Sequence, residues 1–300
     1  MSEPCDCLII GGGPAGLTAA IYLARFRRNV IVADDGKSRA ALIPESHNYP
    51  GFSGGVAGPE LLAALRHQAE QYGTVLRHAR ITDLRRHNGG FQAASPEGTL
   101  QAQYVLLATG IVDEAPELPG LRDAIYRGAL RFCPICDGYE AMDRHIGVLG
   151  RAAVACKKAL FLRTYSRRVT VLPIDQPDRI DAGVVRELQA AGIHVPDEPV
   201  IDVDRSGEKI TAVMRSGARC ELDVLYPALG CEVRSELATT LGAESDDVGC
   251  LKVDNRQATT VQGLYAAGDV VTDLHQISVA TGHAAIAATC IHNRLESNFR

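Results

Sequence analysis

The sequence predicts an α/β protein of two doubly wound domains with parallel sheets, because a strand, helix, strand pattern occurs twice in its 300 residues. A chain of this length is about twice as long as one typical domain, which also favours two domains. The apolar runs and helical patterns of the two copies lie at 6–10, 17–25 and 30–33, and at 146–149, 155–165 and 169–172.

A glycine-rich turn separates the first strand from the first helix. Gly11, Gly13 and Gly16 have the spacing G-x-G-x-x-G, in which the glycines allow a tight turn, approach of a pyrophosphate and close helix packing, respectively. The phosphates then face the helix N-terminus. Asp34 follows about 20 residues later, where it or its neighbour Asp35 can accept hydrogen bonds from a ribose diol. This order predicts a dinucleotide site rather than a glycine-rich turn without a ligand.

Two further apolar strands suggest how the domains are arranged. The strand at 104–107 ends in the turn Ala108-Thr109-Gly110, and 225–230 repeats this pattern. Prolines at 114–120 predict a first crossing between domains, and we expect the return between Gly230 and Gly249. We therefore expect two Rossmann-like (doubly wound, three-layer) nucleotide-binding domains, the second inserted in the first. The expected limits are 1–115 with 241–300 for the first domain and 116–240 for the second.

Composition and charge exclude several classes of partner. The formal charge of −5 gives no reason to expect binding to nucleic acid or to an anionic membrane surface. Residues 1–7 carry no basic segment ahead of the first apolar run, and no apolar stretch approaches the roughly 20 residues of a membrane span. We expect a cytoplasmic protein with no nucleic-acid or membrane partner.

The nine cysteines include one pair with C-x-x-C spacing, Cys133 and Cys136. A tetrahedral zinc site would lack two ligands, so we expect no metal. Such a pair can close a small disulfide ring and favours reversible thiol exchange over the alternative of two buried thiols that happen to be close in sequence. The remaining cysteines, such as Cys7, Cys156 and Cys290, are expected to be structural.

Several sequence blocks, in the same order over nearly the whole chain, resemble the low-molecular-weight thioredoxin reductases, which are FAD-dependent pyridine nucleotide-disulfide oxidoreductases of class II. The resemblance implies FAD in the first nucleotide site, a thioredoxin-like partner and a homodimer. The blocks are the first strand-helix-strand unit, Asn48-Tyr49-Pro50-Gly51-Phe52, Ala108-Thr109-Gly110, Cys133-Pro134-Ile135-Cys136-Asp137-Gly138 and Gly263-Leu264-Tyr265-Ala266-Ala267-Gly268-Asp269.

The same resemblance implies roles for individual residues. Cys136 would face the flavin, and Cys133 would exchange with the partner after the domains rotate. Asp137 would donate or accept the proton that thiol exchange needs, although without the family it reads as a turn residue. Asp269 would bind the ribityl chain. The implied flavin-site residues are Gly11, Gly13, Pro14, Ala15, Gly16, Asp34, Asn48, Ala108, Thr109, Gly110, Gly268, Asp269, His275, Gln276 and Ile277, the last three at the pyrimidine edge.

The second strand-helix-strand unit departs from the family. It keeps Gly150, but Arg151 and Ala152 replace glycines, and a β-carbon at Ala152 obstructs a pyrophosphate. NADPH-dependent relatives carry a His-Arg-Arg cluster where this chain has Pro173-Ile174-Asp175, so NADPH is not expected. Asp175 suits the ribose diol of NADH, which leaves NADH open, but loss of nicotinamide binding is favoured. Relatives without these determinants take electrons from ferredoxin or another flavin, or pass them to oxygen.

Three functions remain in view. The leading one moves two electrons between FAD, the Cys133/Cys136 disulfide and an external dithiol, on a thioredoxin-like protein or a small molecule. The second is an oxygen-dependent oxidase of a small dithiol metabolite; relatives of that kind usually have His after the cysteine pair, so Asp137 favours the reductase direction. The third is a flavin redox sensor without turnover.

Overall fold

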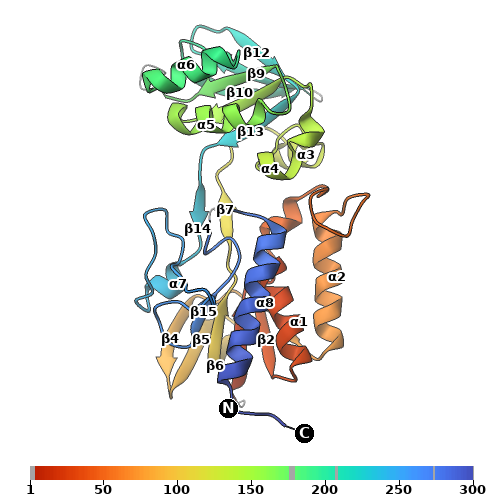
Figure 1. Cartoon of the computed structure of the whole chain (residues 1–300), viewed down its shortest axis with the longest axis vertical. Helices are drawn as coiled ribbons and strands as arrows, with labels where there is room; N and C mark the ends of the chain where they lie inside the picture. Colours follow the sequence, from red (N-terminus) through yellow and green to blue (C-terminus); the bar gives the residue numbers. More distant parts are fainter. Residues whose placement is uncertain (1–3, 176–179, 207–208, 273, 300) are drawn as a thin grey trace.

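Two domains, stacked along the long axis of the molecule, make up the structure (Figure 1). Two short antiparallel strands join them, β7 (Ile111–Asp113) and β14 (Cys231–Val233). One domain is formed from both ends of the chain and the other is inserted, so the predicted fold class is confirmed. The structure is a computed structural model, and it describes residues 4–175, 180–206, 209–272 and 274–299.

The first domain contains a seven-stranded sheet with the order β3-β2-β1-β6-β5-β4, in which β15 pairs with the C-terminal end of β6. β1, β2, β3, β6 and β15 are parallel, whereas β4 and β5 form an antiparallel edge. The strands are β1 (Cys5–Ile10), β2 (Val30–Asp34), β3 (Val75–His78), β4 (Asp83–His87), β5 (Gly90–Ser95), β6 (Gly98–Leu107) and β15 (Leu264–Ala266).

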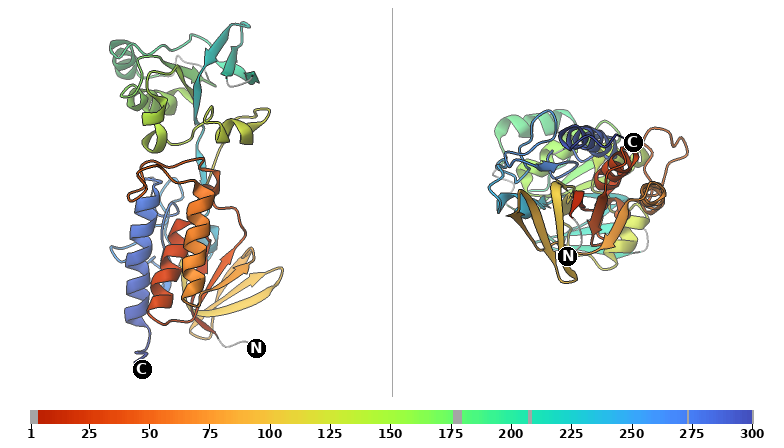
Figure 2. Two further views of the ribbon diagram at one scale, coloured as in Figure 1. Left: turned by 90° about the vertical axis from the view of Figure 1, so that its right-hand side faces the viewer. Right: turned by 90° about the horizontal axis from the view of Figure 1, so that it is seen from below.

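Each face of this sheet has its own apolar core. Alternate side chains of β1 point to opposite faces, so Ile9 packs toward the helices and Leu8 toward the other side. Helices α1 (Pro14–Arg25), α2 (Gly58–Gln71) and α8 (Ile277–Arg294) lie side by side on the first face (Figure 2, left). Buried alanines, including Ala19 and Ala284, let α1 and α8 pack closely. This packing holds the C-terminal end of β1 and the N-terminal end of α1 in place on either side of the glycine-rich turn.

The inserted domain contains a parallel three-stranded sheet, β13-β8-β9, and an antiparallel three-stranded sheet, β10-β11-β12. The second predicted strand-helix-strand unit is present as β8 (Ile146–Gly150), α5 (Ala152–Leu162) and β9 (Val169–Pro173). The other elements are α3 (Leu121–Tyr126), α4 (Pro134–Asp137), η2 (Tyr139–Ala141), α6 (Ala182–Ala190), β10 (Val200–Ser206), β11 (Lys209–Met214), β12 (Arg219–Leu222) and β13 (Val224–Ala228).

The chain returns to the first domain at the beginning of the segment expected for the second crossing. β14 already pairs with β7, and the side chains of Val233, Ala238 and Ala243 pack in the first domain's core. Helix α7 (Glu236–Thr239) lies beside β4 of that domain. We therefore propose a boundary near Gly230, which moves residues 231–240 from the inserted domain to the first.

Candidate functional site

A cavity of about 600 Å³ extends from the glycine-rich turn of the first domain to the cysteine pair of the inserted domain. This volume lies in the range usual for ligand and cofactor sites. Every residue implied for the flavin site lines the cavity except Gly16, and so do Cys133, Cys136 and Asp137. Residues far apart in the sequence therefore meet in one site. The 3₁₀ turn η1 (Arg39–Leu42) contributes further lining residues that the sequence did not single out.

The glycine-rich turn has the geometry of a phosphate cradle. Gly11 has a φ of +109°, and a β-carbon there would overlap the carbonyl oxygen of Ala108. A β-carbon on Gly16 would overlap the Gly11 carbonyl oxygen, so Gly16 serves the packing of α1 rather than the cavity surface. Gly13 is the N-cap of α1 and leaves that helix end without a side-chain cap. The free helix N-terminus and the open turn fit the pyrophosphate of a dinucleotide.

Asp34 lies directly against this turn at the end of β2. A β-carbon at Gly12 would overlap the Asp34 carboxylate, so Gly12 makes room for it, a role that the motif spacing did not reveal. Asp34 Oδ2 also accepts a hydrogen bond from Arg66 Nη2 of α2 (2.6 Å). The neighbouring Asp35 Oδ1 accepts from the backbone N–H of Lys37 (3.2 Å) and so closes a local turn. Both acids line the cavity, but Asp34 is the one held against the phosphate turn.

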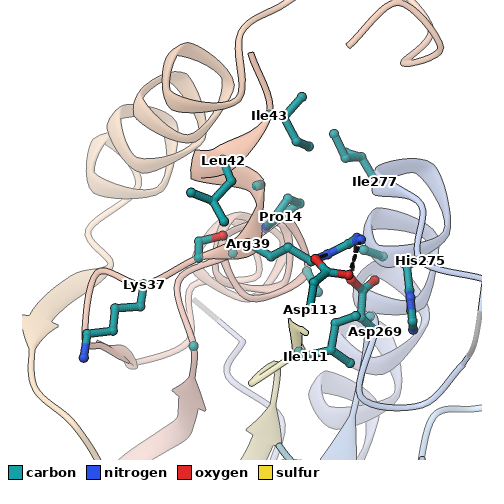
Figure 3. Close-up of a pocket in the computed structure, with 18 of the residues that line it drawn as sticks. Pro14, Lys37, Arg39, Leu42, Ile43, Ile111, Asp113, Asp269, His275 and Ile277 are labelled. Carbon is teal, nitrogen blue, oxygen red and sulfur yellow. Dashed lines mark hydrogen bonds and ion pairs between the residues drawn. The ribbon is translucent and has the colours of Figure 1, made fainter. Parts of the chain in front are cut away.

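A partly buried cluster of Arg39, Asp113 and Asp269 lines the cavity (Figure 3). Arg39 Nε and Nη2 donate to the two carboxylate oxygens of Asp113 (2.5 and 3.0 Å), and Arg39 Nη1 lies 3.6 Å from Asp269 Oδ2. Burial opposes the guanidinium charge, but the pairing with Asp113 outweighs it and raises the pKa of Arg39. Burial also raises the pKa of the Asp269 carboxyl, although Arg39 counteracts this. The cluster links η1, the connecting strand β7 and the turn before α8.

Cys133 and Cys136 form a disulfide, whereas the other seven cysteines are not disulfide-bonded. Gln276 Nε2 of the first domain lies 3.4 Å from each of the two sulfur atoms and can donate to both. Asn48 Nδ2 donates to the Gln276 side-chain oxygen (2.9 Å) and to the carbonyl oxygen of Ile135 between the cysteines (3.3 Å). The disulfide thus faces the cavity and contacts the first domain.

Asp137 directly follows the disulfide in the sequence, and its side chain is hydrogen-bonded to Tyr226 of β13. The Tyr226 hydroxyl donates to Asp137 Oδ1 (2.8 Å), and Arg131 Nη1 donates to the Asp137 carbonyl oxygen (2.6 Å). Burial raises the pKa of Asp137 to about 6, while Arg131 and the Tyr226 hydrogen bond counteract it. A carboxyl with this pKa can both donate and accept a proton near neutral pH. Tyr226 was not identified from the sequence, where it reads as one more residue of a buried strand.

The corresponding helix N-terminus of the inserted domain differs from that of α1. Asp175 Oδ1 accepts a hydrogen bond from the backbone N–H of Ala152, at the first turn of α5 (2.9 Å). The Ala152 side chain is buried, and a β-carbon on Gly150 would overlap the Ala228 carbonyl oxygen. The carboxylate of Asp175, expected from the sequence to suit a ribose, instead caps the helix end where a nucleotide phosphate would bind.

Neither a metal site nor a membrane helix is found in the part of the chain that the structure describes. No group of three or more His, Cys, Asp or Glu side chains there could hold a metal ion. No helix among the described residues is both long and apolar enough to span a bilayer.

The dinucleotide cradle and the disulfide at two ends of one cavity define a nucleotide-dependent disulfide oxidoreductase. A family model described as pyridine nucleotide-disulphide oxidoreductase matches residues 5–284, and the chain belongs to this family. It is 32% identical to a thioredoxin reductase of Mycolicibacterium smegmatis over 296 residues, which covers 95% of this chain and 94% of the relative. With a thioredoxin reductase of Treponema pallidum it shares 29% identity, covering 96% of both chains.

Solved structures agree with this assignment. An oxidoreductase from Agrobacterium tumefaciens is 30% identical and superimposes with a TM-score of 0.85, covering 97% of this chain and 98% of that one. The crystal structure of HlmI is 27% identical with a TM-score of 0.90, covering 98% and 93%. The chain is therefore an FAD-dependent disulfide oxidoreductase of the low-molecular-weight thioredoxin reductase type, as the sequence predicted.

Proposed function

We propose that this enzyme moves two electrons between FAD, the Cys133–Cys136 disulfide and the dithiol or disulfide of a thioredoxin-like protein, without taking electrons from NADPH. The names of its relatives support the choice of partner. The contrast between the two helix N-termini supports the exclusion of NADPH. The N-terminus of α1 is uncapped and opens into the cavity, whereas that of α5 is capped by Asp175.

The capped helix is the observation that carries this proposal. Binding of a pyrophosphate at α5 would require the Asp175 carboxylate to leave the Ala152 N–H, and the buried Ala152 methyl group would still restrict backbone approach. Once displaced from the helix end, the Asp175 carboxylate would lie near the ribose and repel the additional phosphate of NADPH. NADH carries no additional phosphate, but the Asp175 cap and the Ala152 methyl group would obstruct its pyrophosphate in the same way. We therefore infer that the inserted domain serves to carry the disulfide rather than to bind a nicotinamide.

The residues around the cavity have separable roles in this proposal. When bound along the cradle, FAD supplies a site that accepts or donates an electron pair. The residues proposed to hold it are those implied for the flavin site except Gly16, with Gly12 and Arg39 in addition. Cys136 is proposed to exchange electrons with the flavin and Cys133 with the external partner. Asp137, with a pKa near 6, is proposed to hold or release the proton that accompanies thiol exchange.

Capping of α5 also favours a second candidate function. Without a nicotinamide donor, electrons can enter from an external dithiol and leave from FAD to oxygen. Oxidation of a small dithiol R(SH)₂ would then give the cyclic disulfide, and the two electrons and two protons would convert O₂ into H₂O₂. A homodimer and a ferredoxin donor remain proposals from family resemblance.

Anaerobic stopped-flow absorbance of the FAD-loaded protein tests the proposal. The protein is mixed separately with NADPH, NADH and a reduced thioredoxin, and the oxidised-flavin band is followed. We expect bleaching by reduced thioredoxin and none by NADPH on the same time scale. Rapid bleaching by NADPH would contradict the inferred loss of the nicotinamide site. Bleaching by a small dithiol but not by reduced thioredoxin, followed by reoxidation on admission of oxygen, would favour the second candidate.

A further inference from the structure

The side chain of Gln276 contacts the disulfide, and its expected position at the pyrimidine edge of the flavin does not explain this contact. It reaches from the turn before α8 in the first domain to both sulfur atoms of the inserted domain, at 3.4 Å each. Cys133 Sγ has a second donor, the backbone N–H of Cys136 at 3.2 Å. The amide of Gln276 can therefore donate a hydrogen bond to a reacting sulfur atom, and it also links the two domains.

Neighbouring groups fix which end of the Gln276 amide faces the sulfurs. The carbonyl oxygen of His275 lies 3.0 Å from Gln276 Nε2, and a carbonyl can only accept a hydrogen bond, so this end must be the NH₂ group. At the opposite end, Asn48 Nδ2 donates to Gln276 Oε1 (2.9 Å).

The orientation of Asn48 is determined in the same way. Its Nδ2 lies 3.3 Å from the Ile135 carbonyl oxygen, which again can only accept, and its Oδ1 accepts from the Ser46 hydroxyl (3.1 Å). Ser46 is buried and forms a bridge to Val56 in the same loop, so this end of the chain of contacts is anchored. A relay therefore runs from Ser46 through Asn48 and Gln276 to the two sulfurs.

We propose that Gln276 is a catalytic residue that stabilises a thiolate at Cys133 or Cys136 through the one Nε2–H that the His275 carbonyl does not use, and that Asn48 is the positioning residue that aims it. The inference rests on the proposed dithiol exchange. In that exchange the Cys133–Cys136 bond breaks and the partner's disulfide forms: R(SH)₂ and the protein disulfide give RS₂, one thiolate, one thiol and one released proton. A hydrogen-bond donor favours the thiolate over the thiol and lowers the thiol pKa.

The relay also couples thiolate stabilisation to domain orientation. Ser46, Asn48 and Gln276 belong to the first domain, while the cysteines and Ile135 belong to the inserted one. The donors reach the sulfurs only while the two domains keep the orientation seen here. A thiolate formed in this orientation is stabilised beside the cavity, whereas rotation of the inserted domain would remove the donors and raise the thiol pKa. Gln276 would thus make the dithiol most reactive where it faces the flavin.

The test is the pH dependence of cysteine alkylation in the reduced holoenzyme. Protein reduced with excess dithiothreitol is desalted anaerobically and treated with iodoacetamide, and labelling of Cys136 is followed by mass spectrometry. The variant Gln276→Met keeps the side-chain length without a donor, and we expect its alkylation rate at neutral pH to fall about tenfold, with the titration moved to higher pH. Gln68→Met, on the exposed side of α2, is the matched control and is expected to behave as the wild type.

Asn48→Ala tests the positioning role. Its thiol pKa should rise less than that of Gln276→Met, because the His275 carbonyl still holds Gln276 Nε2. Gln276→Glu removes the donors, adds a negative charge and should raise the thiol pKa most, so it replaces the methionine variant if that one does not fold. FAD content and thermal unfolding report folding independently. Superimposable titrations of wild type and the Gln276 variants would overturn the proposal. Because a chemical reductant forms the dithiol, this result is independent of whether thioredoxin or NADPH reduces the enzyme.

Discussion

Replacing Tyr226 by Phe should move the pH dependence of the thiol exchange step to higher pH. The Tyr226 hydroxyl donates to Asp137 Oδ1 at 2.8 Å and is fully buried, so the substitution removes a hydrogen bond to a carboxylate and leaves the ring in place. Hydrogen bonds to charged groups contribute about 1.5–3 kcal/mol. About 1.4 kcal/mol corresponds to a tenfold change in the proton-dissociation constant, or to one pKa unit. The pKa of Asp137, now about 6, should therefore rise to between about 7 and 8.

Single-turnover kinetics measure this change directly. Flavin bleaching by a dithiol is followed anaerobically from about pH 5 to about pH 9 in wild type and Tyr226→Phe, and the midpoint of the rate profile is compared. Tyr265→Phe is a matched control, since Tyr265 is also fully buried but its hydroxyl faces Cys290 Sγ at 3.6 Å. An unchanged midpoint in Tyr226→Phe, or one displaced to lower pH, would refute the role assigned to this hydrogen bond.

Three further predictions concern the cradle, the charged cluster and the capped helix. Gly13→Ala should weaken FAD binding but change the unfolding free energy by no more than about 0.5 kcal/mol. Gly16→Ala should lower the unfolding free energy, measured in urea, by about 1–3 kcal/mol. Equal losses of unfolding free energy in the two variants would contradict the roles assigned to these glycines. Arg39→Met should lower the unfolding free energy by about 2–3 kcal/mol at neutral pH, because Asp113 would be left unpaired; an unchanged unfolding free energy would count against the ion pair. Asp175→Ala should cost about 1 kcal/mol in urea unfolding through loss of the α5 cap, and Asp175→Asn less, whereas an unchanged midpoint in both would argue against capping.

Much of the fold could be predicted because its determinants are local. Apolar runs followed by glycine and a helical pattern define each strand-helix-strand unit, and both units are found where the pattern placed them. The antiparallel pairing of β7 with β14 was not predictable in the same way. These strands have only three residues each, and their pairing joins residues more than a hundred positions apart. The return crossing was accordingly expected over a range rather than at Gly230.

The candidate site was predicted where a motif has its own spacing and missed where tertiary contacts create it. The glycines and the C-x-x-C pair carry their signal in a few consecutive residues. Arg39 and Tyr226 carry none, because the first becomes important only through Asp113 and Asp269 and the second only beneath Asp137. Asp175 was singled out, but as a ribose ligand; its contact with Ala152 depends on how the end of β9 meets the first turn of α5.

The most direct test of electron transfer through the disulfide compares flavin reduction by a dithiol in the FAD-loaded wild type and in Cys136→Ser under anaerobic conditions. If the disulfide beside the cavity connects the external dithiol to the flavin, the oxidised-flavin band should bleach rapidly in the wild type and remain nearly unchanged in the variant over the same time. Equal bleaching rates in the two proteins would mean that electrons reach the flavin without Cys136, and would contradict electron transfer through the disulfide.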